Sequence, residues 1–220
     1  MSFAAAPDPT FRLIPSQFPP VDAFANVAAA ADLAAVMKLE GWTNDSLVAQ
    51  RLARLPRAEW AFDRPNASIV MAAFLHCAPS GGRFNGHDLG AWYGAFDLKT
   101  AIAEVAHHMR RELWNIDRPV SIRRFAAYRA RLEGEYEDLR AAGELHADFH
   151  DPASHAGAQI YGEACRAAGG DGIIYDSLRV AGGVNVVAYR PNKIFDVEVT
   201  DYWRITASLD TGPIAQRMKA

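Results

Sequence analysis

The sequence predicts an α+β protein, and three features support this prediction. The N-terminal portion is alanine-rich with a helical pattern, an amphipathic helix follows near the middle of the chain, and the C-terminal half contains short runs of strand-forming residues separated by glycines. Helices and strands that are segregated along a chain are typical of the α+β class. With 220 residues, of which 50% are hydrophobic, the chain is long enough for one domain and an extension.

Residues 1–62 are predicted to form a helical N-terminal extension. Residues 1–20 are rich in proline and should be extended, whereas Asp22 can cap a helix that ends near Gly41. The segment TNDSLVAQRLARL, residues 43–55, predicts a second short amphipathic helix. No candidate catalytic residue lies in this portion, so any activity is expected in residues 63–220.

The middle of the chain contains two predicted elements. The apolar run ASIVMAAFLHCA, residues 67–78, is interpreted as a buried strand, although such a run is also compatible with a helix. Asp97 is a candidate cap for the helix DLKTAIAEVAHHMRREL. One apolar stripe at helical spacing predicts the buried face of this helix, and it comprises Leu98, Ile102, Val105 and Met109.

The C-terminal half is predicted to be rich in strands. Residues 120–134 contain strand formers, and the arginines of RRFAAYRAR, residues 123–131, suggest a solvated strand edge. Residues 133–153 are acidic and irregular, after which Ser154 can cap a helix that ends near Ala168. Three short strands are then expected in GIIYDS, VNVVAYR and KIFDVEV.

Composition excludes several classes of protein. The net charge of −3 and the absence of a strong basic stripe argue against direct nucleic-acid binding. Two cysteines far apart in sequence suggest a reduced, cytoplasmic protein, and the first residues do not resemble a signal peptide. The longest apolar region, residues 23–37, is too short and too polar to cross a membrane.

Four polar or aromatic residues are candidates for a functional site. Arg83 follows two glycines, Tyr93 lies between glycines, and Glu104 is off the apolar stripe of its helix. Ser177 follows a predicted strand. Each residue alone also fits a structural role: a surface arginine, a core tyrosine, an exposed glutamate paired with His108, and a polar loop residue.

A metal site is a remote alternative. His146, His150 and Asp148 lie close together in HADFHDPASH, and two histidines four residues apart can bind a metal from one helix face. The segment contains Pro152 and lacks the glutamate of an H-E-x-x-H motif, so solvated loop histidines are favoured and no metal is expected.

Four segments together resemble the RES-domain family. They are GGRFN, WYGAFDLKTAIAE, GGDGIIYDSLR and GGVNVVAYR. The arginine, glutamate and serine for which the family is named match Arg83, Glu104 and Ser177 in order, and the family's tyrosine matches Tyr93. The resemblance covers roughly residues 66–200, and the N-terminal portion looks like the leader of longer members.

The resemblance implies a toxin of a type II toxin–antitoxin system. The fold should resemble ADP-ribosyltransferase toxins, with a small split sheet, flanking helices and an NAD cleft. NAD would be consumed by phosphorolysis or hydrolysis, or its ADP-ribose would be transferred to a protein. The expected partner is an Xre-like helix-turn-helix antitoxin, and the resemblance also allows a homodimer within that complex. A non-catalytic binding module is a further alternative.

The resemblance also assigns roles to residues. Glu104 would stabilise the oxocarbenium-like transition state at the ribose, and Arg83 would hold the pyrophosphate or the ribose. Tyr93 would stack on the nicotinamide ring, while Ser177 would hydrogen-bond the nicotinamide side of NAD or a phosphate. Asn85, in the same GGRFN motif as Arg83, is assigned to NAD binding.

Overall fold

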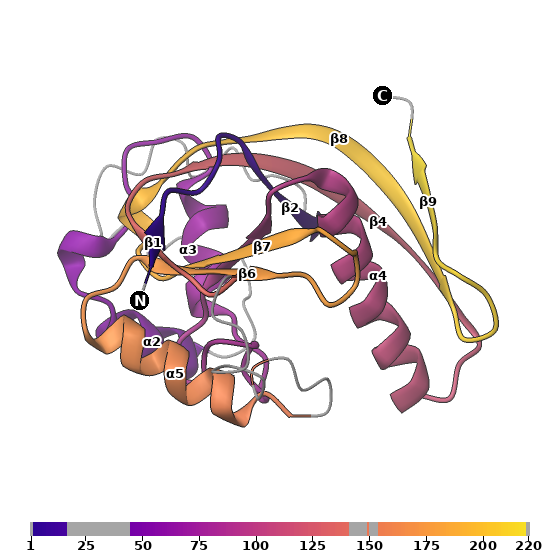
Figure 1. The fold of residues 1–220 in the computed structure, drawn as a ribbon, viewed down its shortest axis with the longest axis horizontal. Helices are drawn as coiled ribbons and strands as arrows, with labels where there is room; N and C mark the ends of the chain where they lie inside the picture. Colours follow the sequence, from indigo (N-terminus) through magenta and orange to yellow (C-terminus); the bar gives the residue numbers. More distant parts are fainter. Residues whose placement is uncertain (1, 17–44, 141–148, 150–153, 219–220) are drawn as a thin grey trace.

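One mixed sheet organises the fold (Figure 1). The computed structural model describes residues 2–16, 45–140, 149 and 154–218. Within them, nine strands follow the order β1-β5-β6-β7-β3-β2-β4-β8-β9. The strands are β1 (Phe3–Ala4), β2 (Thr10–Pro15), β3 (Trp92–Ala95), β4 (Val120–Leu132), β5 (Tyr136–Asp138), β6 (Gly172–Asp176), β7 (Val184–Ala188), β8 (Ile194–Ser208) and β9 (Ile214–Arg217).

The helices cover both faces of this sheet. They are α2 (Asp45–Arg54), α3 (Ala67–Leu75), α4 (Leu98–Asn115) and α5 (Ala156–Ala167), with short 3-10 turns η2 (Arg57–Glu59) and η4 (Pro191–Lys193). Apolar side chains of α2 and α3 form one core cluster with one face of the sheet. Two separate clusters on the other face lie beneath α4 and α5. The α+β class is therefore confirmed.

The N-terminal residues are part of the sheet. As predicted, residues 2–16 are extended, and β2 lies between β3 and β4 near the centre of the strand order. The predicted helix 43–55 is present as α2, whereas the predicted helix starting at Asp22 lies outside the described residues. The division of the chain between residues 62 and 63 stays a prediction.

Most of the apolar run 67–78 is the helix α3, Ala67–Leu75, so its interpretation as a strand was wrong. The buried residues of α3 are Ala67, Val70, Met71, Phe74 and Leu75, which is the i, i+3, i+4, i+7, i+8 spacing of a helix face. The opposite face contains alanines instead of charged residues, so the polar half of the pattern is missing from the sequence. Alanine, methionine and leucine also favour a helix intrinsically.

The two remaining helices begin close to their predicted starts. The Asp97 carboxylate accepts hydrogen bonds from the Thr100 backbone N–H and hydroxyl, both at 2.8 Å, and so caps α4. The α5 helix begins at Ala156, and the Ser154 hydroxyl accepts a 3.3 Å bond from the Ala156 N–H. After α5, Gly169 adopts a φ of 89°, a left-handed conformation that suits glycine at a helix end.

The long strands differ most from their predictions. The β4 strand pairs with β2 on one side and β8 on the other, so the RRFAAYRAR segment is an interior strand and not a sheet edge. The KIFDVEV segment is only the first part of β8, which is 15 residues long and ends at Ser208. A short strand, β5, also lies within the segment that was predicted to be irregular. The β4 strand itself was predicted, and its place inside the sheet was not, whereas the second half of β8 was missed as a strand.

No helix among the described residues is both long enough and apolar enough to cross a bilayer.

Candidate active site

The candidate site lies on the sheet face that carries α4 and α5. The α4 helix packs against β2, β3, β7 and β8, and α5 packs against β6. Asn185 in β7 is in register with Tyr175 of β6 and with Ala95 of β3, so these three side chains share this face. Asn185 is only 4% exposed. A polar group is therefore buried at the boundary between the two core clusters.

Glu104 reaches this boundary from the second turn of α4. Its Oε1 accepts a hydrogen bond of 2.7 Å from the Ser177 hydroxyl and one of 2.8 Å from Asn185 Nδ2. Both donors therefore contact the same carboxylate oxygen. Among the described residues, no donor lies within hydrogen-bonding distance of Oε2. One oxygen thus accepts two hydrogen bonds from the protein, and the other accepts none from a described residue.

The Ser177 hydroxyl uses both its lone pairs and its proton in hydrogen bonds. Its oxygen accepts from the backbone N–H groups of Arg179, at 3.1 Å, and Val180, at 3.3 Å. The backbone N–H of Ser177 donates to Gly183 O at 2.8 Å, which closes the loop between β6 and β7. Because two N–H groups occupy the lone pairs of the hydroxyl, its single proton goes to Glu104.

Arg83 lies in the loop between α3 and β3. Its Nη1 donates a 2.6 Å bond to Phe149 O. The loop is fixed by Tyr93, whose hydroxyl accepts from Phe84 N at 2.9 Å, and by Gln159 of α5, whose Nε2 donates to Gly82 O at 2.8 Å. At Gly82 a Cβ would lie 2.6 Å from the Tyr93 hydroxyl, so this approach requires glycine.

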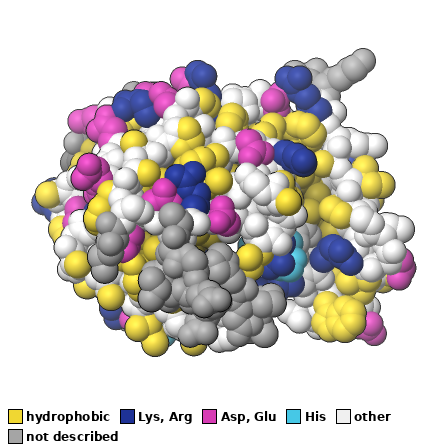
Figure 2. Space-filling view, viewed as in Figure 1, with side chains coloured by type: hydrophobic (Ala, Val, Ile, Leu, Met, Phe, Trp, Pro, Cys, Tyr) yellow, Lys and Arg dark blue, Asp and Glu magenta, His cyan; other side chains and the backbone are white. Residues whose placement is uncertain are grey.

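Arg179 interacts with the Glu104 carboxylate and with two further arginines. Burial lowers the pKa of Arg179, the Glu104 carboxylate opposes this effect, and Arg83 and Arg111 add to it. None of these three arginines forms an ion pair with a described residue, and Arg179 Nε is buried without an acceptor among the described residues. Figure 2 shows a hollow beside α4 in which histidine and Lys or Arg side chains come together. Guanidinium groups that form no ion pair with a described residue favour an anionic ligand.

Sequence comparison assigns the family. The RES domain family model matches residues 51–208, more than two thirds of the chain. The chain belongs to the RES domain family. A comparison with curated proteins finds no match. Among solved structures, the M. tuberculosis MbcT–MbcA toxin–antitoxin complex is similar, with 20% identity, a TM-score of 0.42, and coverage of 57% of this chain and 72% of that chain.

The histidines of this RES domain adjoin the same site. His107 and His108 follow Glu104 on α4, with ring centroids 5.9 Å apart. Burial lowers the pKa of His107 to about 4, and Arg179, His108 and Arg111 contribute to the decrease while Glu104 opposes it. Burial also lowers the pKa of His155, at the start of α5, with Arg83 and Arg111 acting in the same direction. These histidines are therefore neutral near pH 7.

Asn85 and Tyr93 of the RES domain have bonds within the protein. Asn85 is 1% exposed, its Nδ2 donates to Gly86 O at 2.8 Å and Leu89 O at 3.1 Å, and its Oδ1 accepts from the Tyr93 hydroxyl at 2.7 Å. All its polar side-chain atoms thus support the loop that carries Arg83. Burial raises the pKa of Tyr93 well above its ordinary value, so the phenol stays protonated. Their predicted contacts with NAD stay predictions.

The metal hypothesis concerns residues that the structure does not describe. His146, His150 and Asp148 all lie outside the described residues. In the part of the chain that the structure describes, no group of three or more His, Cys, Asp or Glu side chains is placed to hold a metal ion.

Sequence reasoning missed Asn185 and Arg111. Asn185 had a usable signal, because it is the single polar residue within the apolar strand VNVVA. Arg111 follows Glu104 by two helical turns, and this spacing places both on one side of α4. The contact between Asn185 and Glu104 could not be derived from spacing alone, because it depends on how β7 and α4 pack together.

Proposed function

We propose that this RES domain is the NAD-consuming toxin of a toxin–antitoxin pair. The observation that carries the proposal is the arrangement of Glu104: two donors bind Oε1, and Oε2 accepts from no described residue. Arg179 interacts electrostatically with Glu104, Arg83 and Arg111, and none of these arginines forms an ion pair with a described residue. A carboxylate with one free oxygen among unpaired guanidinium groups suits a ligand that combines phosphates with a cationic ring. NAD is such a ligand.

The chemistry is cleavage of the bond between nicotinamide and ribose. The electron pair of the C1′–N bond leaves with nicotinamide and neutralises its positive ring, so the leaving group needs no proton. The ribose develops positive charge as in glycoside cleavage. The free Oε2 of Glu104 accepts a bond from a ribose hydroxyl and stabilises this charge, and the acceptor then attacks C1′.

The arginines bind the phosphates of NAD. A guanidinium forms charge-assisted, often bidentate, hydrogen bonds with phosphate oxygens. Arg83 is held in place by Phe149 O, and Arg179 is carried on the loop that Ser177 closes. The ring of Tyr93, from the neighbouring strand β3, is available to contact the nicotinamide, with a cation–π contribution of about 0.5–2 kcal/mol.

Membership in the RES domain family supports the biological setting. Toxins of this family pair with a helix-turn-helix antitoxin according to the resemblance described above, and we propose the same kind of partner here. Phosphate and water are the proposed acceptors, giving ADP-ribose 1-phosphate and ADP-ribose respectively.

The test is nicotinamide release from NAD by the purified chain, with and without phosphate. We expect turnover by the wild type and a roughly 100–1000-fold decrease in kcat for Glu104→Gln. Glu112→Gln is the matched control, because Glu112 lies on the same helix but pairs with Arg123 at the surface, and it should retain activity.

Folded wild-type protein that releases no nicotinamide would overturn the proposal. Equal rates for the wild type and Glu104→Gln would remove Glu104 from its assigned role. The product identifies the acceptor: ADP-ribose 1-phosphate indicates phosphate, ADP-ribose indicates water, and a labelled protein indicates transfer to a side chain.

A further inference from the structure

We propose that Asn185 is a positioning residue that, with Ser177, orients the Glu104 carboxylate so that Oε2 faces the ligand. This inference rests on the proposed function for its kinetic consequence. The contact itself is a property of the fold, because Asn185 donates from Nδ2 to Glu104 Oε1 at 2.8 Å.

The burial of Asn185 requires an explanation. It lies within β7, whose other residues are all apolar, and it is paired on both sides by β3 and β6. An amide buried without a hydrogen bond destabilises the folded state. An apolar residue would fit this strand better. The hydrogen bond to Glu104 is therefore the reason that we infer for an amide at this position.

The direction of the bond follows from the chemistry of the two groups. An ionised carboxylate can only accept, so Asn185 must present its NH₂ group to Glu104. Ser177 presents its single proton to the same oxygen. Two donors from different strand ends that converge on one oxygen restrict rotation of the carboxylate, and a restricted carboxylate keeps Oε2 in one position.

The two donors are themselves rigidly placed. Ser177 is the first residue of the loop between β6 and β7, and Asn185 is the second residue of β7, just after that loop. The loop is closed by the bond from Ser177 N to Gly183 O. The strands on either side are in register from Gly172↔Ala188 to Asp176↔Val184. The hairpin therefore acts as a fixed support, and α4 brings Glu104 against it.

This role predicts a specific kinetic change. In Asn185→Asp, a second carboxylate replaces the donor and repels Glu104, so Oε2 is no longer held. We expect kcat for NAD cleavage to fall about 100-fold, the cost of misplacing a reacting group by about 1 Å. KM should stay near the wild-type value, because the arginines that bind the phosphates are unchanged.

The experiment combines this measurement with a stability cycle. Thermal unfolding is measured for the wild type, Glu104→Gln, Asn185→Asp and the double variant. In the double variant the amide introduced at position 104 can donate to the carboxylate introduced at position 185. This removes the repulsion between two carboxylates, although the Ser177 hydroxyl then loses its acceptor. We expect the double variant to be more stable than Asn185→Asp and still inactive, because the carboxylate at position 104 is gone.

Asn192→Asp is the matched control. Asn192 Nδ2 donates to Ala58 O at 3.0 Å, in a contact that involves no residue of the site, so this change should leave kcat unaltered. If Asn185→Asp fails to fold, Asn185→Ala replaces it in the kinetic measurement, with the same expected loss in kcat.

The outcomes separate the two proposals. A folded Asn185 variant whose kcat equals that of the wild type overturns the positioning role. A double variant that is no more stable than Asn185→Asp also overturns it. If the wild type itself releases no nicotinamide, the proposed function fails, and the stability cycle still decides whether Asn185 holds Glu104.

Discussion

Glu104 shows how contacts define the orientation of a single side chain. From its position on the α4 helix it lies off the apolar stripe, a location that usually indicates exposure. In the fold it is half-buried, because β6 and β7 bring Ser177 and Asn185 against it. The same carboxylate would be free to rotate in water. Its two donors convert a flexible surface group into one with a fixed and a free oxygen.

His107 makes the stability of the domain depend on pH. Its pKa is lowered from 6.5 to about 4 by burial and by neighbouring positive groups. Between these values the unfolded chain binds a proton that the folded chain does not, so this histidine contributes a loss of stability as pH falls from about 6.5 to about 4. We expect His107→Gln to show a smaller decrease in Tm than the wild type between pH 7 and pH 4.5.

The control for this prediction is His87→Gln. His87 is an exposed loop residue, so its replacement should not reduce the acid-induced decrease in Tm. Identical pH dependence in the wild type and His107→Gln would contradict the prediction.

At the scale of elements, α4 is the helix whose start the sequence specified best. Asp97 is a typical cap, and its carboxylate bonds the Thr100 N–H at 2.8 Å. By contrast, α3 was mistaken for a strand, because alanines on its outer face hide the helical period. A cap is a local interaction that sequence reveals, whereas the burial of an all-apolar segment depends on which elements surround it.

Removal of the α4 cap should weaken the helix that carries Glu104. For Asp97→Ala we expect a loss of about 1 kcal/mol in the free energy of unfolding, since one N–H at the helix start loses its acceptor. This corresponds to a decrease of roughly 2–4 °C in Tm, measured by circular dichroism. Asp97→Asn keeps an acceptor oxygen and should remain close to the wild type, so an equal loss in both variants would argue against the capping role.

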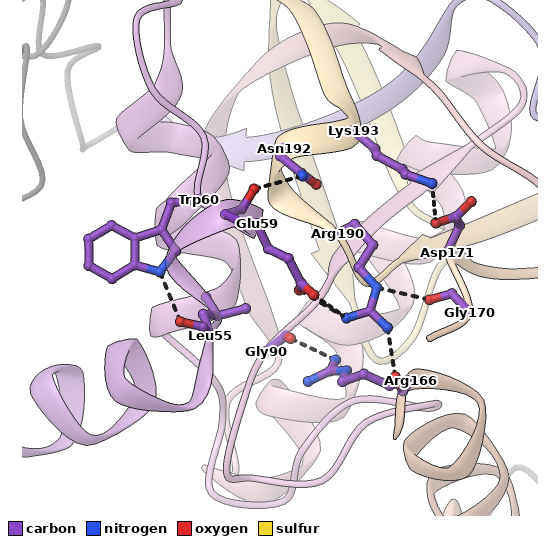
Figure 3. A network of polar contacts seen from close by, with 11 residues as sticks. Leu55, Glu59, Trp60, Gly90, Arg166, Gly170, Asp171, Arg190, Asn192 and Lys193 are labelled. Atoms are coloured by element: carbon purple, nitrogen blue, oxygen red, sulfur yellow. Dashed lines mark hydrogen bonds and ion pairs between the residues drawn. The ribbon is translucent and has the colours of Figure 1, made fainter. Parts of the chain in front are cut away.

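At the scale of the whole molecule, a polar network joins the N-terminal and C-terminal parts of the chain (Figure 3). Arg190 Nη1 donates to both carboxylate oxygens of Glu59 at 2.9 Å, and its Nη2 donates to Arg166 O at 2.7 Å. Arg190 Nε also donates to Gly170 O at 3.2 Å. One guanidinium thus connects η2, α5 and the end of β7.

Loss of this guanidinium should destabilise the entire domain. The side chains of Arg190 and Glu59 are only 13% and 21% exposed, so Arg190→Ala leaves a carboxylate largely buried without a partner. We expect a loss of about 2–4 kcal/mol, or roughly 4–16 °C in Tm. Arg129→Ala is the control, because its pair with Glu198 is about half exposed, and it should lower Tm much less than Arg190→Ala does. Equal effects of the two changes would contradict the prediction.

The sequence by itself determined the α+β class, the cap and extent of α4, the start of α5, the strands β6 and β7, and the family to which the chain belongs. These depend on local signals: caps, turn glycines and short motifs. It also indicated Arg83, Glu104 and Ser177 as a set, although from a resemblance and not from spacing.

Only the tertiary structure decided that β2 lies inside the sheet, that residues 67–75 form a helix, and that Asn185 meets Glu104. The physical reason is that these features depend on contacts between residues far apart in the chain. Asn185 and Glu104 are separated by 81 positions. Their contact exists because strand pairing and helix packing bring β7 and α4 together. No local sequence pattern predicts a contact between residues so far apart in the chain.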